Sequence, residues 1–378
     1  MLRDVGAPIA AVSGVRQQPE PHPPSSAKLT QAASGWFEVS GVTSDDASSA
    51  LDMFIEQLAS HGFSTASLSH VNVYLRTQAD FPLLNRVYQS YFGVSPPSRA
   101  CIAIPQQVSR FALSATGYHR PSQPQLERRA LHVQGRSYWA PANIGPYSQA
   151  VRIGGRISIA GQIALGAADG VLRGEGDGEL QTVLSLQHTR RIASAVLETR
   201  TDAHWVEAGV CWVTSPHLAC RAAIAANTTW SKRTPMAYIL LARDALPRGA
   251  EIEWQVTVAA PDAVFDEEGG EEDVRAIYDA SESTQEELAW NNVRASTGTL
   301  ASGIAFARAG ASLEPLRQAL GAPLSLRLFI ATLDSVAVLA ARDWLQKTFP
   351  HAALMVLPVL GIWSGEQREW DLAISWSS

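Results

Sequence analysis

One order of predicted elements occurs three times along this chain of 378 residues. Apolar residues alternate where strands are expected, and they recur at spacings of three and four where helices are expected. In each copy the order is strand, helix, strand, helix, strand, strand, within residues 35–119, 130–262 and 285–378. A unit of this kind covers one face of its sheet with helices and needs another layer for the other face. The sequence therefore predicts an α+β chain of three tandem units.

Polar segments precede and separate these units. Residues 1–34 include a run rich in proline, glutamine and serine that cannot bury enough apolar surface to order itself, which predicts a disordered tail or linker. Residues 120–125 contain two prolines among polar residues, and residues 266–273 are mostly acidic, so that they repel one another in water. Both of these segments are predicted to be linkers.

The middle unit opens with a hairpin signal. Apolar and polar residues alternate over residues 150–153 and again over residues 156–159, and Gly154-Gly155 lies between the two runs. Consecutive glycines favour a two-residue turn with positive φ. The segment before the hairpin, residues 145–149, and the segment after it, residues 160–162, are therefore expected to lie close together at its open end.

Composition excludes several classes of function. The net charge is −6 and the pI is near 5.9, so the chain as a whole offers no basic surface for the phosphates of a nucleic acid. The three cysteines are too few for a disulfide framework, and neither they nor the nine histidines have the spacing of metal ligands. No apolar run is long enough to cross a membrane. We expect a cytoplasmic protein with no metal, no cofactor, no nucleic-acid partner and no membrane contact.

Four short motifs resemble those of the RidA family, also called YjgF or L-PSP endoribonuclease-like. The first unit contains the helix Asn85-Arg86-Val87-Tyr88-Gln89-Ser90-Tyr91-Phe92 and the strand start Pro97-Ser98-Arg99-Ala100-Cys101. The middle unit contains Gly145-Pro146-Tyr147-Ser148-Gln149 and the segment 246–253, in which Glu253 follows Pro247 by six residues. The third unit is identified by its repeat pattern alone.

This resemblance implies the chorismate-mutase type of fold, in which three subunits form a ring around a central barrel of sheets. A chain that carries three such units is expected to form the ring by itself. We therefore predict an intrachain pseudo-trimer with a central sheet barrel, and a monomer in solution.

The resemblance also implies a set of site residues. Arg99 would bind a substrate carboxylate, because a planar guanidinium forms two parallel hydrogen bonds with that group. Glu253 would handle a water molecule or its proton, and Tyr147 would line the same site. These three are the predicted catalytic residues. The predicted ligand-binding residues are Asn85, Cys101 and Gly161.

The arginine and the glutamate occur in different units. By sequence, Ala237 and Ala352 stand at the arginine position of the middle and third units, and Phe111 and Leu113 stand near the glutamate position of the first. Since each site of this family lies between neighbouring subunits, we expect one composite site where the first unit meets the middle one.

Two of these residues also have a structural interpretation. Glu253 alternates with Ile252 and Trp254, as the polar face of a strand does. Cys101 is explained more readily as a small buried side chain than as a nucleophile, because nothing near it in the sequence would lower its pKa.

The tandem units behind a low-complexity segment also resemble the C-terminal region of fungal diphthine-ammonia ligases, which amidate diphthine on elongation factor 2. The ATP-pyrophosphatase domain of those enzymes carries a Ser-Gly-Gly-Lys-Asp-Ser loop, which this sequence lacks. The expected function is the RidA-like region of such a protein, with a pocket for a small carboxylate or imine that supplies ammonia. The expected partners are elongation factor 2 or an ATP-pyrophosphatase domain.

Two alternatives remain open at this point. One is a free-standing enamine and imine deaminase that uses the same composite pocket. The other is a non-catalytic module that binds a ligand or serves as a scaffold. The sequence does not decide whether the chain is an enzyme.

Overall fold

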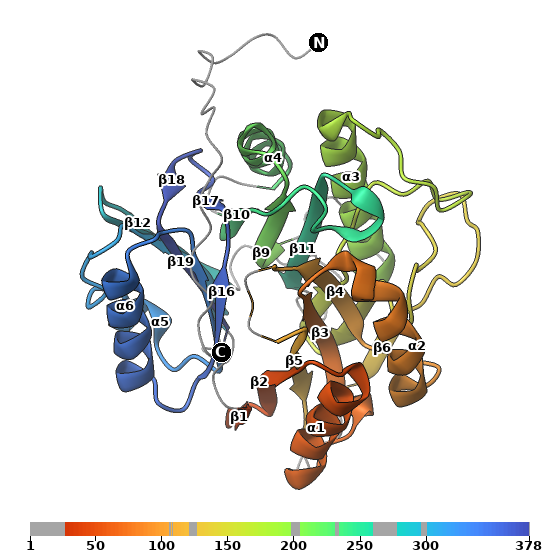
Figure 1. Cartoon of the computed structure of the whole chain (residues 1–378), viewed down its shortest axis with the longest axis horizontal. Helices are drawn as coiled ribbons and strands as arrows, with labels where there is room; N and C mark the ends of the chain where they lie inside the picture. Colours follow the sequence, from red (N-terminus) through yellow and green to blue (C-terminus); the bar gives the residue numbers. More distant parts are fainter. Residues whose placement is uncertain are drawn as a thin grey trace, which may run out of the picture.

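Three β-sheets with helices on their outer faces make up the computed structural model of the chain (Figure 1). The structure describes residues 27–105, 107, 109–120, 127–197, 205–230, 234–259, 278–295 and 301–377. The predicted α+β class is confirmed. Most of the predicted tail and almost all of the two predicted linkers lie outside the described residues.

The first sheet has the strand order β1 (Lys28–Gln31), β2 (Trp36–Ser44), β5 (Phe111–Tyr118), β3 (Leu68–Leu75) and β4 (Ser98–Ala103). Helices α1 (Ala47–Ser60) and α2 (Phe81–Phe92) pack on it, and the short turns η1 (Thr65–Ser67) and η2 (Gln78–Asp80) precede β3 and α2. β1 corrects the predicted tail 1–34, because residues 28–31 pair with β2 along their whole length.

The second sheet contains the predicted hairpin, which is confirmed. Strands β7 (Ala150–Ile153) and β8 (Arg156–Ile159) pair antiparallel across Gly154, whose φ is +55°. The sheet has the order β18, β17, β10, β9, β11, β8, β7, β6. Its other strands are β6 (Arg128–Leu131), β9 (Trp205–Val213), β10 (Met236–Leu240), β11 (Ile252–Ala259), β17 (Gly361–Trp363) and β18 (Glu369–Trp370). Helices α3 (Gly178–Leu197) and α4 (Pro216–Thr229) pack on it, and the short turn η3 (Pro247–Gly249) precedes β11.

The third sheet has the order β12 (Tyr278–Thr284), β13 (Leu288–Ala295), β14 (Ala301–Ala307), β19 (Leu372–Ser377), β15 (Ser325–Ile330) and β16 (Ala353–Pro358). Its helices are α5 (Leu316–Leu320) and α6 (Ser335–Thr348). Among the helices that the structure describes, none is both long and apolar enough to cross a bilayer.

Five strands of each sheet repeat one topology. The orders β1-β2-β5-β3-β4, β7-β8-β11-β9-β10 and β13-β14-β19-β15-β16 match position by position. In each case the last two strands of that order run parallel. One backbone hydrogen bond recurs at the same place, from Ile104 to Leu75, from Leu241 to Val213 and from Val359 to Ile330. These bonds fix which residues correspond between the three units.

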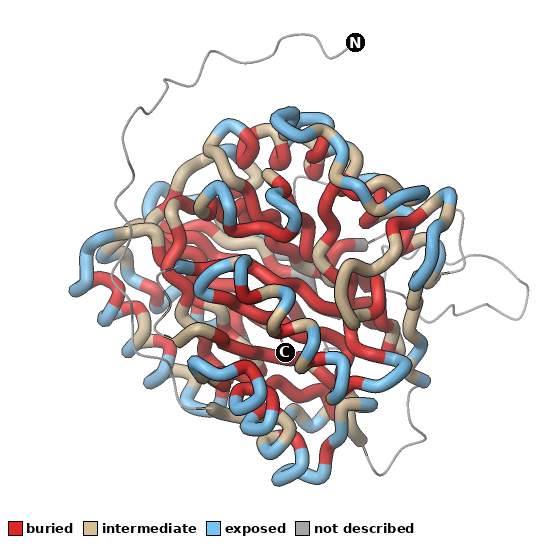
Figure 2. The backbone as a smooth tube through the Cα atoms, turned by 45° about the vertical axis from the view of Figure 1, so that its right-hand side comes forward, coloured by how far each residue is buried: buried red, intermediate tan, exposed pale blue. Residues whose placement is uncertain are grey.

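The inner faces of the three sheets pack against one another. A single cluster of buried apolar side chains has members from all three, among them Phe37 of β2, Trp212 of β9 and Phe329 of β15. The rings of Trp212 and Phe329 meet edge to face, with their centroids 5.8 Å apart. In Figure 2 the buried strands run through the middle of the molecule and the exposed stretches lie around them.

One edge of each sheet contacts the next unit. Ser98 at the start of β4 forms a parallel bridge with Ser148, in front of β7, and β10 pairs with β17. Lys28 and Thr30 of β1 donate hydrogen bonds to the carbonyls of Pro350 and His351, just before β16. The contacts therefore run from the first unit to the second, from the second to the third, and from the third back to the first.

The predicted central barrel is not found as one closed sheet in the described part of the chain, where the strands form three separate sheets. Large inner side chains such as Trp212 and Phe329 explain this difference. Sheets that pack face to face through such side chains typically lie about 10 Å apart, whereas a closed barrel needs strands about 4.8 Å apart.

Candidate functional site

Arg99 lies near the start of β4, on the side of the first sheet that α2 covers. Its Nη2 donates a hydrogen bond of 2.7 Å to Asn85 Oδ1. Its guanidinium carbon lies 4.7 Å from the ring centroid of Tyr88 and 5.5 Å from that of Phe81. Residues 81, 85 and 88 follow one another at helical spacing, so that one face of α2 surrounds the arginine. As a result Arg99 is only 2% exposed.

The loop before β7 brings Tyr147 against the same guanidinium. The carbon atom of that group lies 5.3 Å from the ring centroid of Tyr147, which is a cation–π distance. Asn143 holds the loop, because its Nδ2 donates to the carbonyls of Gly145 at 2.7 Å and of Tyr147 at 3.2 Å. A Cβ on Gly145 would lie 2.5 Å from Arg99 Nη2, so a side chain there would force the guanidinium to move.

Glu253 reaches this junction from β11 of the second sheet. Gly161, just after β8, donates its backbone N–H to the carbonyl of Arg99 at 3.0 Å. A Cβ on Gly161 would lie 1.7 Å from Glu253 Oε1, so the carboxyl group fills the space over this glycine. Two backbone hydrogen bonds between Gln162 and Trp254 hold the two segments in register. The structure thus brings residues of the first and second units together at one junction.

Three polar atoms at the junction are buried without a hydrogen-bond partner among the described residues. They are Arg99 Nη1, Glu253 Oε2 and the hydroxyl oxygen of Tyr88. Burial raises the pKa of Glu253 to about 8, although the nearby Arg99 charge lowers it. At neutral pH the carboxyl group is therefore mostly protonated, next to a guanidinium that is bound to an amide and to aromatic rings. Such a site favours an anionic ligand for Arg99 and a hydrogen-bond acceptor for Glu253.

Tyr147 and Cys101 remain neutral at this junction. Burial raises the pKa of the Tyr147 hydroxyl, and it raises the pKa of the Cys101 thiol to about 12. Cys101 is 4% exposed and its carbonyl accepts a hydrogen bond from Gln78 Nε2 at 3.0 Å. The same Nε2 donates to the carbonyl of Ala245 at 2.8 Å, so Gln78 ties the backbone at Cys101 to the second unit. A neutral buried thiol agrees with the structural interpretation of this cysteine.

The other two units carry apolar residues at the corresponding places. The hydrogen bonds that recur between the units align Arg99 with Met236 and Leu354. This corrects the positions inferred from the prolines, Ala237 and Ala352, because the strand register differs from the spacing counted along the chain. Matching bonds from residues 76, 214 and 331 to residues 110, 251 and 371 align Glu253 with Ala112 and Ala373. In the first unit this position lies between the expected Phe111 and Leu113.

Sequence reasoning missed three residues at the junction, namely Gln78, Phe81 and Tyr88. Phe81 and Tyr88 share a helical face with Asn85, and that spacing was the available signal. No sequence pattern marks Gln78, because the two carbonyl groups that it binds, of Cys101 and Ala245, lie in different units. The described residues contain no group of three or more His, Cys, Asp or Glu side chains that could hold a metal ion.

Substitution of Gly161 tests how tightly the two units meet. Gly161→Ala places a Cβ where Glu253 Oε1 lies, so the carboxyl group has to move within a packed site. We expect a loss of about 1–3 kcal/mol in the free energy of unfolding, measured by denaturant titration. Gly135→Ala is the matched control, since a Cβ there meets no atom within 4 Å. Equal stability of the two variants would contradict the close contact between Gly161 and Glu253.

The raised pKa of Glu253 predicts a pH dependence of stability. Between pH 4.5 and about 8 the folded chain holds a proton on Glu253 that the unfolded chain releases. Stability is therefore lost as the pH rises through this range, by up to about 1.4 kcal/mol per pH unit. Glu253→Gln should remove this contribution and make the slope shallower, whereas Glu175→Gln at an exposed position should leave the slope unchanged. Parallel stability curves for wild type and Glu253→Gln would show that the carboxyl group is already ionised at low pH.

Comparison with known proteins relates the chain to one class of enzymes. It is 37% identical over 213 residues to a diphthine-ammonia ligase of Schizosaccharomyces pombe, which covers 56% of this chain and 34% of the yeast protein. It is 34% identical over 128 residues to a diphthine-ammonia ligase of Saccharomyces cerevisiae, which covers 30% of this chain and 18% of that protein. The chain thus spans about a third or less of these relatives. No family model matches it.

Several solved structures are similar to about a third of the chain. The YjgF gene product of E. coli is 23% identical, with 33% of this chain and 95% of that chain covered and a TM-score of 0.28. RidA from a Psychrobacter species is 22% identical, with 33% and 98% covered and a TM-score of 0.29. The similarity to the diphthine-ammonia ligases is the more extensive of the two, since it covers 56% of this chain.

Proposed function

We propose that this chain is the RidA-like region of a diphthine-ammonia ligase-type protein and takes part in diphthamide biosynthesis on elongation factor 2. The identity of 37% over 213 residues with the Schizosaccharomyces pombe ligase supports this proposal. Since the chain spans 34% of that protein, the ATP-dependent step is assigned to a separate ATP-pyrophosphatase domain. Elongation factor 2 and that domain are the proposed partners.

The role that we assign to this region is the release of ammonia in a single composite pocket. The observation that carries it is the meeting of Arg99 from the first unit with Tyr147 and Glu253 from the second. A small carboxylate with an imine group matches the hydrogen-bonding groups of this arrangement. Its carboxylate would bind the free Nη1 of Arg99, and its nitrogen would accept a hydrogen bond from Glu253.

The proposed reaction is hydrolysis of the imine. Glu253 donates its proton to the imine nitrogen while water attacks the carbon, so that a C–O bond forms and the C=N double bond becomes a single bond. The glutamate anion then takes one proton from the added water, which leaves a neutral hydroxyl group on the carbon, and passes a proton to the amine nitrogen. The C–N bond breaks, ammonia leaves, and the glutamate takes the proton of the hydroxyl group as the C=O bond forms. A keto acid remains, and the glutamate ends protonated as it began. A carboxyl pKa near 8 suits this exchange at neutral pH.

We further propose that the three units are arranged as an intrachain pseudo-trimer. Three matching strand orders and edge contacts from each unit to the next support this arrangement. It accounts for a single pocket, because in the part of the chain that the structure describes only the junction of the first and second units combines the arginine with the glutamate. The other two arginine positions hold Met236 and Leu354.

A non-catalytic binding module is the second candidate. Arg99 and Glu253 are each only 2% exposed, and a ligand has to displace the packing around them to reach both. In that case the pocket binds a small carboxylate without turning it over. A free-standing deaminase differs from the first proposal only in its partners, because it uses the same pocket and reaction.

Ammonia release from an imine formed in situ by an amino acid oxidase distinguishes these candidates. We expect the wild-type chain to accelerate release above the rate without protein, and Arg99→Met and Glu253→Gln to lose about 100-fold or more of kcat/KM. Arg86→Met, on the exposed side of the same helix, is the matched control and should keep the wild-type rate. If Arg99→Met folds and releases ammonia as fast as wild type, the catalytic proposal is wrong. If wild type gives no acceleration while still binding a keto acid, the binding module is favoured.

A further inference from the structure

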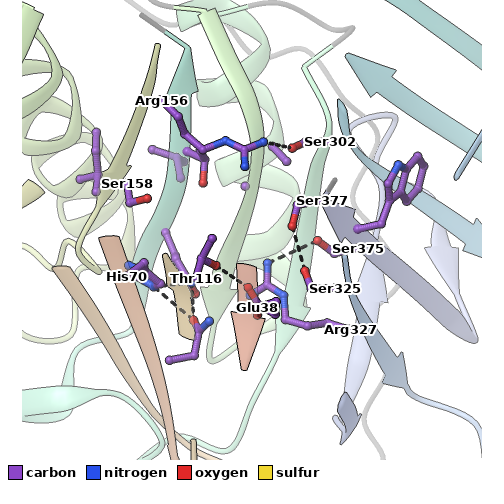
Figure 3. A pocket seen from close by; sticks show the side chains of 18 residues that line it. Glu38, His70, Thr116, Arg156, Ser158, Ser302, Ser325, Arg327, Ser375 and Ser377 are labelled. Carbon is purple, nitrogen blue, oxygen red and sulfur yellow. Dashed lines mark hydrogen bonds between the residues drawn. The ribbon is translucent and has the colours of Figure 1, made fainter. Parts of the chain in front are cut away.

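A second polar site lies where the inner faces of all three sheets meet, away from Arg99. It is a cavity of about 70 Å³ (Figure 3). The first unit lines it with Glu38, His70, Asn72 and Thr116, and the second with Arg156, Ser158, Gln255 and Thr257. The third unit contributes Ser302, Ser325, Arg327, Ser375 and Ser377. None of these residues belongs to the composite pocket.

The two arginines of this cavity differ in their partners. Arg156 Nε donates to Glu207 Oε2 at 2.8 Å, in an ion pair whose side chains are each 3% exposed, and Arg156 Nη2 donates to Ser302. Arg327 has the hydroxyl group of Ser375 at 3.3 Å from its Nη2, and its Nη1 is buried without a hydrogen-bond partner among the described residues. Within the described segments, no carboxylate is hydrogen-bonded to Arg327.

The acid that faces Arg327 is Glu38. Burial raises the pKa of Glu38 to about 8, although Arg327 and Arg156 lower it and Thr116 donates a hydrogen bond of 2.6 Å to its Oε2. At neutral pH this carboxyl group is mostly protonated, so it does not neutralise Arg327. It is also able to donate a hydrogen bond of its own to an oxygen atom in the cavity.

His70 adds no charge to the cavity. Burial lowers its pKa to about 3, so the ring is neutral at physiological pH. Its Nδ1 lies 2.8 Å from Ser98 Oγ, and its Nε2 lies 3.0 Å from Gln255 Nε2 and 3.2 Å from Asn72 Oδ1. The net charge at the wall is therefore that of one guanidinium.

Serine hydroxyl groups complete the wall around that guanidinium. Ser325 and Ser377 lie with their hydroxyl oxygens 2.8 Å apart, and Ser375 accepts from Arg327. A hydroxyl group rotates to donate to whatever acceptor is present. One uncompensated guanidinium ringed by rotatable donors is the arrangement that binds an oxyanion.

We propose that the central cavity holds a small oxyanion, bound by Arg327 and the surrounding serine hydroxyl groups. One water molecule needs about 10–15 Å³ on a comparable scale, so the cavity takes several water-sized groups. Inorganic phosphate, sulfate or a one- to two-carbon carboxylate fits this size, and a nucleotide does not. Because Glu38 of the first unit lines the same cavity and can donate a hydrogen bond to the anion, the anion links the third unit to the first.

Thermal unfolding of the full chain tests this proposal. Phosphate, sulfate and formate are each titrated at constant ionic strength, with chloride as the reference anion. At an anion concentration of ten times its Kd, we expect the Tm to rise by about 2 °C for at least one of the three oxyanions. Comparison of the three titrations then shows which class of oxyanion binds. Arg327→Met should abolish the rise. Arg317 is an exposed arginine on α5 that pairs with Glu314, and Arg317→Met should retain the rise in Tm.

A second measurement covers the case in which Arg327→Met does not fold. Crystals of the wild-type chain soaked in selenate should give an anomalous peak between Arg327 and Ser375. Water alone in the cavity, or the same Tm rise in Arg327→Met as in wild type, would overturn the proposal. Because none of the cavity residues lines the composite pocket, loss of imine hydrolysis in Arg99→Met leaves this outcome unaffected.

Discussion

The hydrogen bond from Gly161 N–H to the carbonyl of Arg99 is the contact on which the candidate site depends. It fixes the edge of the first sheet against the segment that follows the hairpin of the second. With that register set, the guanidinium of Arg99 faces the ring of Tyr147 and the carboxyl group of Glu253 lies over Gly161. A buried guanidinium is costly unless its hydrogen bonds and charge are compensated. Asn85 and three aromatic rings supply part of that compensation, and a bound carboxylate would supply the rest.

The inner packing of the sheets explains why the units stay together and why they leave a polar cavity. Trp212 and Phe329 meet edge to face in the shared apolar cluster. Beside these rings the inward side chains become polar, as with Gln255 on the neighbouring strand β11 and Arg327 on β15. The same face therefore serves as an apolar core at one end and as a charged cavity at the other. Removing an arginine from such a place leaves its hydroxyl partners unsatisfied, which costs more than the pair itself contributes.

Much of this architecture follows from local patterns. The hairpin around Gly154 was readable because its alternation and its turn residues agree, and the helices were readable from their apolar spacing. That Arg99 shares a site with residues of the second unit was predictable, because the arginine motif occurs in the first unit and the tyrosine and glutamate motifs occur in the second. The exact correspondence of residues between the units could not be predicted from the sequence. Counting from a proline gave Ala237 as the counterpart of Arg99, whereas the backbone hydrogen bonds align Met236 with Arg99. The strand β1 was also missed, since only its pairing with β2 orders it.

The central cavity was not predictable for a related reason. Its walls come from strands that are far apart in the sequence, and on each strand the polar residues read as an ordinary solvated face. Only the arrangement of three sheets turns those faces toward one another. Arg327 in particular alternates with Leu326 and Leu328 and has the pattern of an exposed strand residue.

A crystal structure of the chain with a small keto acid tests the central claim most directly. The account predicts one ligand per chain at the junction of the first and second sheets, with its carboxylate on Arg99 Nη1 and its carbonyl group beside Glu253. The places that correspond to Arg99, at Met236 and Leu354, should be empty. Binding at those places, or a ligand elsewhere with Arg99 and Glu253 untouched, would contradict it.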